Sequence, residues 1–167
     1  MEAADHAHHH EMPTAGSALT GVAISATLHC LTGCALGEIA GVALGTALGL
    51  SNLATIALAI GLAFVFGYGL TSLPLLRAGL ALGAVIPIAL ASDTLSIATM
   101  EVVDTAFLLL LPGAMAATLA SGLFWWSLAL ALALAFVAAV PVNHWLLERG
   151  RGHAVVHRFH EEHADHR

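Results

Sequence analysis

One apolar segment of this chain carries a histidine, two cysteines and a glutamate at helical spacing. Residues 27–38 read Thr-Leu-His-Cys-Leu-Thr-Gly-Cys-Ala-Leu-Gly-Glu. Cys30, Cys34 and Glu38 recur every fourth residue, which places them on one face of a helix, and His29 lies beside that face. Thiolate and imidazole groups bind transition-metal ions, and carboxylates extend the range toward Fe(II) and Mn(II). The spacing therefore indicates a candidate transition-metal site.

The composition is typical of a membrane protein with several spans. Hydrophobic residues make up 59% of the 167 residues, charged residues only 10%, and lysine is absent. The apolar segments are too long for strands and lack the alternation of a membrane β-barrel. We predict an all-α protein, a bundle of four transmembrane helices spanning residues 17–49, 53–72, 78–111 and 123–147, between histidine-rich tails at 1–16 and 148–167.

The arginines predict the orientation of these spans. Arg77 lies between the second and third spans, the other four arginines follow the fourth, and the two remaining loops carry no charge. The positive-inside rule then places both termini in the cytoplasm. The acidic N-terminus contains no Arg or Lys, so we expect no cleaved signal peptide and a retained first span.

With this orientation, polar residues of different spans fall at matching heights. Three acidic residues of the third span share one helical face: Asp93, Glu101 and Asp104. Counting residues from the non-cytoplasmic ends places Glu101 level with Glu38, near the middle of the membrane. The same count places Asp93 level with His29. His144, in the Asn-His-Trp segment that closes the fourth span, falls at that height too.

We therefore predict a metal site built from eight candidate ligands: His29, Cys30, Cys34, Glu38, Asp93, Glu101, Asp104 and His144. Ionisable side chains are costly at membrane depth, which favours a functional role for them. Zn, Cu, Ni and Fe remain open as the metal. Because these ligands must release protons to bind an ion, Glu38 and Glu101 would exchange protons for metal. The predicted function is binding and transport, or delivery, of a transition-metal ion.

Two other functions fit the same residues. In a membrane redox or haem protein, His29 and His144 would ligate a haem, or Cys30 and Cys34 would react with a partner thiol. In a structural partner of a larger membrane complex, the polar column would only hold helices together. The chain has no nucleophile elbow, phosphate loop or HExxH motif, so we expect no enzyme. Without a basic patch we expect no nucleic-acid partner.

Two further patterns concern packing and metal supply. Glycines recur every fourth residue in the first span, at positions 33, 37, 41, 45 and 49. Such a glycine stripe lets another helix approach closely, either within the chain or in a homodimer. Histidines recur in both tails, at positions 6, 8, 9 and 10 and at 153, 157, 160, 163 and 166. We expect these tails to form a cytoplasmic surface that concentrates metal.

Three segments also resemble a family of small bacterial integral-membrane proteins classed as a domain of unknown function. They are residues 28–38 (Leu-His-Cys-Leu-Thr-Gly-Cys-Ala-Leu-Gly-Glu), 91–104 and 141–145 (Pro-Val-Asn-His-Trp). The resemblance implies a four-helix membrane bundle in bacteria, but no activity or substrate. We expect the protein to lie in the inner membrane. The resemblance also implies an arginine in many family members where this chain has His144, which weakens the assignment of His144 as a ligand.

Overall fold

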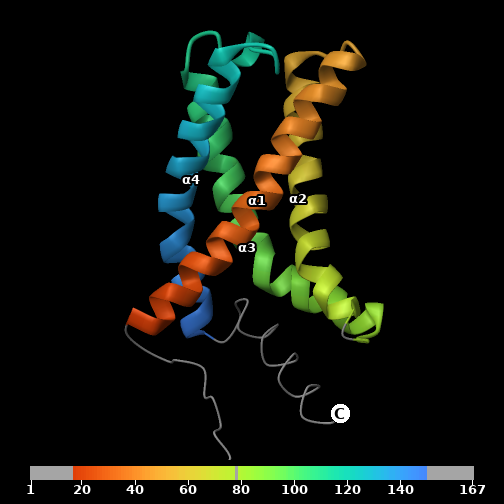
Figure 1. Ribbon diagram of the computed structural model, residues 1–167, viewed down its shortest axis with the longest axis vertical. Coiled ribbons are helices and arrows are strands. Elements are labelled where there is room, and N and C mark those ends of the chain that lie inside the picture. Colours follow the sequence, from red (N-terminus) through yellow and green to blue (C-terminus); the bar gives the residue numbers. More distant parts are fainter. Residues whose placement is uncertain (1–16, 78, 150–167) are drawn as a thin grey trace, which may run out of the picture.

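Four long α-helices make up the bundle in the computed structural model, which describes residues 17–77 and 79–149 (Figure 1). Each is long and apolar enough to cross a membrane. The prediction of an all-α membrane protein with four transmembrane helices is confirmed. The helices are α1 (Ser17–Ala47), α2 (Asn52–Arg77), α3 (Leu82–Leu110) and α4 (Gly122–Glu148), and a short 3-10 helix, η1 (Ala114–Ala116), precedes α4.

The connection between α2 and α3 differs from the prediction. The predicted second span ended at residue 72, which left Pro74 in the connection, but Pro74 lies inside α2, which continues to Arg77. A proline in the last turn removes only one hydrogen bond, which membrane helices tolerate. Gly79 ends the helix instead: it has a φ of +90° and its N–H donates to Leu76 O at 3.0 Å. Consequently α3 begins at Leu82, not at residue 78.

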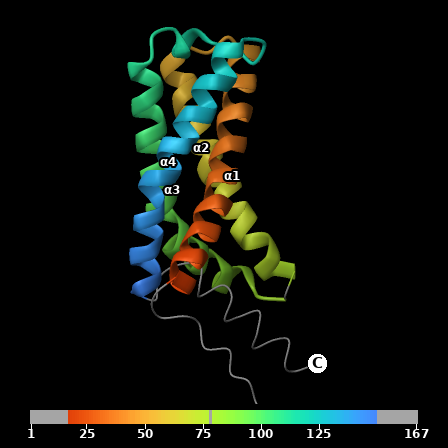
Figure 2. The same ribbon diagram turned by 60° about the vertical axis from the view of Figure 1, so that its left-hand side comes forward.

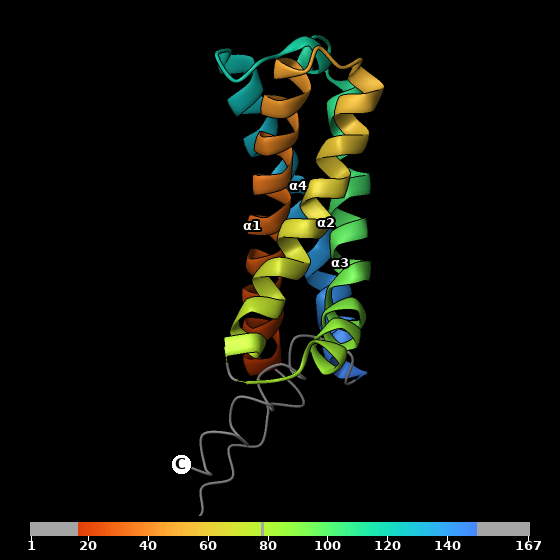
Figure 3. The ribbon, with the colours of Figure 1, turned by 90° about the vertical axis from the view of Figure 1, so that its right-hand side faces the viewer.

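The helices run alternately up and down. The start of α1, the end of α4 and the α2–α3 connection lie at one end of the bundle, and the other two connections lie at the opposite end (Figures 1 and 3). Helix α1 packs against all three other helices, whereas α2 and α4 have little contact with each other. Helices α1 and α3 thus meet in the middle of the bundle, and they carry most of its ionisable residues.

The glycine stripe of α1 packs against α2. A Cβ atom added to Gly33 would lie 2.7 Å from the Cα of Gly67, and one added to Gly41 would lie 2.5 Å from the Cα of Ala59. Only glycine permits such a close approach of two backbones. Because α2 of the same chain covers the stripe from Gly33 to Gly45, that part is not available for the homodimer that the sequence suggested.

Helix α3 leans at its start. Figure 2 shows its first turns swinging toward the end of α2. Pro87 lies inside α3 at the end of this part, where its missing N–H leaves a helical hydrogen bond unmade. Leu75 and Val85, both fully buried, pack together and hold the two helix ends to each other.

Candidate functional site

Helices α1 and α3 direct their ionisable side chains into the bundle, as the helical spacing predicted. Six of the eight candidate ligands are less than a tenth exposed: Cys30, Cys34, Glu38, Asp93, Glu101 and Asp104. Cys30, Cys34 and Glu38 occupy one face of α1 because they lie four residues apart. The three candidates on α3 share a face with Ile97, which is also fully buried.

Three carboxyl groups form a cluster between α1 and α3. Glu38 interacts electrostatically with both Asp104 and Glu101, most strongly with Asp104. Within residues 17–77 and 79–149, neither oxygen of Glu101 or Asp104 has a well-formed hydrogen bond. Buried carboxyl groups are costly unless they are paired with a cation or hydrogen-bonded. Protons or a nearby cation would offset that cost at this cluster.

Two sulfur atoms lie beside the carboxyl cluster. The thiol of Cys34 donates to the thioether Sδ of Met100 across 3.8 Å, and both side chains are almost completely buried. Glu101 also interacts with the Cys34 thiol. Met100 was not among the predicted ligands, although its position four residues before Asp104 places both on one face of α3. The structure adds a thioether to the thiols and carboxyls expected from the sequence.

A hydrogen-bonded knot joins three helices nearer the start of α1 and the end of α4. Asn143 Nδ2 on α4 donates to Thr27 Oγ1 on α1 at 2.8 Å and to Ser96 Oγ on α3 at 2.9 Å. We refer to these three side chains as the Asn143 knot. Asn143, in the segment that closes the fourth span, is only 4% exposed and faces the bundle interior. Cys30 lies at this level and interacts with Ser96.

The two histidines among the predicted ligands, His29 and His144, are more exposed than the other six candidates. His144 points toward Glu148, with its Nδ1 3.5 Å from Glu148 Oε1 and 31% of its side chain exposed. His144 is therefore not part of the buried column, and a haem held by both histidines would require it to leave Glu148. His29 is half-buried next to Cys30. The histidine-rich tails lie outside the described residues.

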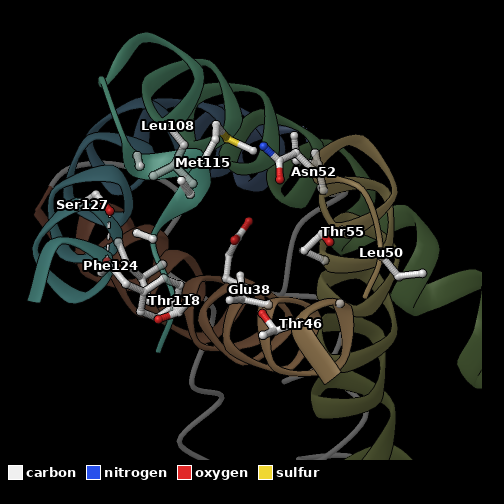
Figure 4. A pocket seen from close by; sticks show the side chains of 18 of the residues that line it. Glu38, Thr46, Leu50, Asn52, Thr55, Leu108, Met115, Thr118, Phe124 and Ser127 are labelled. Carbon is white, nitrogen blue, oxygen red and sulfur yellow. Dashed lines mark hydrogen bonds between the residues drawn. The ribbon is translucent and has the colours of Figure 1, made fainter. Parts of the chain in front are cut away.

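A cavity of about 340 Å³ leads from Glu38 of the carboxyl cluster to the end of the bundle opposite the start of α1 and the end of α4. Its walls include the α1–α2 turn, the η1 segment and the start of α4. Glu38 points into the cavity from α1, and threonine and serine hydroxyls line it, among them Thr46, Thr118 and Ser127 (Figure 4). Among the α1 residues of the cavity wall, Glu38 lies farthest from the turn.

The candidate ligands are spread along the bundle and do not surround one point. In the part of the chain that the structure describes, no three His, Cys, Asp or Glu side chains lie close enough together to hold a metal ion. From the cavity inward, the order is the carboxyl cluster, the Cys34–Met100 pair and the Asn143 knot. An ion moving along this column would meet oxygen ligands first and sulfur ligands second.

Comparison with known proteins places the chain in a family. Neither the curated proteins nor the solved structures give a match. A family model described as "Domain of unknown function (DUF4396)" matches residues 21–152, which include the carboxyl cluster, the sulfur pair and the Asn143 knot. The chain therefore belongs to the DUF4396 family, in agreement with the resemblance noted from its sequence.

Proposed function

We propose that this protein binds a transition-metal ion inside the membrane and transports it along the column between α1 and α3. The observation that carries this proposal is the convergence of Glu38, Glu101 and Asp104 beside Cys34, at the inner end of the cavity. In the proposed orientation, both termini lie on the cytoplasmic side of the bacterial inner membrane. The cavity then opens on the opposite side.

The helices that the structure describes offer almost no positive charge to neutralise these carboxyl groups. The chain has no lysine, and no arginine lies in residues 1–76 or 78–148. Arg77 and Arg149 are at the ends of α2 and α4, remote from the carboxyl cluster along the helices. Protons or an external cation must therefore balance the cluster, because an uncompensated buried charge is too costly. We propose that these carboxyls exchange protons for the metal ion, because ligands must give up protons to bind it.

The column supports transport better than static storage. It has an open end at the cavity, and the Asn143 knot ties three helices together at the other end. A transporter needs a binding site that is accessible from one side and closed on the other. Opening toward the cytoplasm would require the Asn143 hydrogen bonds to break.

Uptake into proteoliposomes tests the proposal. The full chain would be reconstituted, and entry of Zn(II), Ni(II), Fe(II) and Cu(I) would be measured for the wild type, Glu38→Gln and Glu148→Gln. Glu148 is the matched control because it is an exposed carboxylate outside the column. We expect Glu38→Gln to reduce uptake by about tenfold or more and Glu148→Gln to leave it unchanged. Uptake no faster than in protein-free liposomes would refute the proposal.

Stability measurements separate transport from a purely structural role. If the carboxyl cluster only holds helices together, Glu38→Gln changes the free energy of unfolding without changing metal uptake. If the cluster binds the ion, uptake falls even in a variant that retains its helical content and melting temperature. Elemental analysis of protein purified in mild detergent, without a nickel column, identifies the metal that copurifies.

A further inference from the structure

We propose that the transported ion is a soft monovalent d10 ion, Cu(I) in the cell, and that Cys34 Sγ and Met100 Sδ bind it together inside the membrane. This inference rests on the proposed function and names its substrate. The two sulfurs belong to α1 and α3, lie 3.8 Å apart and are fully enclosed, with exposures of 2% for Cys34 and 0% for Met100.

The thioether is the selective element of this pair. Thioether and thiolate sulfur are soft ligands that favour Cu(I) over hard cations. Oxygen ligands alone, such as those of Glu38 and Asp104, would not discriminate in this way. A cation drawn into the carboxyl cluster would next meet Cys34 and Met100, and only a soft ion gains from moving on to them.

The distance between the sulfurs fits one bridging ion. With metal–sulfur bonds of ~2.3 Å, two sulfurs 3.8 Å apart give an S–metal–S angle of about 110°. Separation of the two side chains by a further ~0.8 Å would make the S–metal–S arrangement linear. Two-coordinate Cu(I) and Ag(I) prefer that linear geometry. Met100 can provide this movement because its side chain has three rotatable bonds.

Charge favours a monovalent ion at this position. On binding, the Cys34 thiol passes its proton to the carboxylate of Glu101, with which it interacts, the sulfur–metal bond forms, and the thioether adds no charge. A monovalent ion on one thiolate gives a neutral unit, which is far less costly to bury than a charged one. A divalent ion would need a second anionic ligand at this site. Glu101 interacts with the Cys34 thiol, and it does not supply one once it carries the proton released by that thiol.

Metal titration of the full chain in mild detergent tests the inference. Ag(I), a d10 ion stable in air, and Zn(II) would be titrated against a competing chelator for the wild type, Met100→Leu, Cys34→Ser and Ile97→Leu. Leucine keeps the approximate volume of methionine, so Met100→Leu removes the sulfur with little change in packing. Ile97→Leu is the matched control because it alters packing one turn away on the same buried face. The histidine-rich tails are present in every variant.

We expect Met100→Leu and Cys34→Ser to weaken Ag(I) binding by about tenfold or more, and Ile97→Leu to have no effect. Zn(II) binding should be unchanged by Met100→Leu. X-ray absorption of the Cu(I)-loaded protein should show two sulfur neighbours in the wild type and one in Met100→Leu. If Met100→Leu binds Ag(I) as tightly as the wild type, the inference is wrong, even when Cys34→Ser does not fold.

The two proposals can fail separately. If Glu38→Gln abolishes Zn(II) uptake while Met100→Leu changes the binding of neither Ag(I) nor Zn(II), the transport proposal stands and the soft-ion inference is wrong. If no ion enters proteoliposomes but Ag(I) binding depends on Cys34 and Met100, the sulfur site stands and transport falls.

Discussion

The Asn143 knot should contribute measurably to stability, and Asn143→Ala removes it. Asn143 Nδ2 makes two hydrogen bonds that join α4 to α1 and α3, at 2.8 Å to Thr27 and 2.9 Å to Ser96. Hydrogen bonds between membrane helices contribute about 0.6 kcal/mol on average and at most ~1.7 kcal/mol. Loss of both bonds should therefore lower the free energy of unfolding by about 1–3 kcal/mol.

A double-mutant cycle isolates one of these bonds. Thr27→Val removes the acceptor on α1, and combining it with Asn143→Ala should reveal a coupling energy of about 0.6–1.7 kcal/mol. Thr27 also donates to Ala23 O in its own helix, at 2.8 Å. Thr32 makes the same kind of bond, to Leu28 O at 2.9 Å, on an exposed part of α1. Thr32→Val is therefore the control for loss of the intrahelical bond.

Unfolding by SDS in mixed micelles, followed by far-UV circular dichroism, would give these free energies. Thr27→Val should lower the free energy of unfolding more than Thr32→Val, because Thr27, unlike Thr32, accepts a hydrogen bond from Asn143. Equal costs for the two threonine variants, together with a coupling energy near zero, would refute the reasoning. The knot would then not hold the three helices together.

Two other predictions concern helix packing and orientation. A Cβ at Gly37 would overlap the backbone of Ala63, so Gly37→Ala should lower the free energy of unfolding by about 1–3 kcal/mol. Gly61 has open space around it, so Gly61→Ala should keep the wild-type melting temperature. In intact cells, a membrane-impermeant maleimide should label Leu50→Cys but label Leu82→Cys only after lysis. Both positions are exposed, at 39% and 62%. The reverse labelling pattern would place both chain termini outside the cytoplasm.

The sequence predicted the buried faces well because they depend on helical periodicity. Cys30, Cys34 and Glu38 are buried because residues four apart share a face, and a face with this chemistry cannot meet lipid. The same reasoning placed Glu101 level with Glu38, and the two interact. These features depend on spacing along one helix and on the helical rise.

Residues near helix ends could not be placed in this way. At the end of α4, Asn143 and His144 are neighbours in the sequence, and the rotation of the helix decides which one faces inward. Asn143 does so because it finds partners on α1 and α3, while His144 turns to Glu148. Likewise, periodicity alone did not show that Pro74 remains inside α2.

By itself, then, the sequence determined that four helices cross the membrane and which face of α1 and α3 is polar, because length, hydrophobicity and spacing are local properties. Only the tertiary structure decided that α2 covers the glycine stripe, that Met100 lies against Cys34, and that a cavity leads to Glu38. Those features depend on which helices are neighbours and on how each is rotated. Contacts between residues far apart in the chain set both.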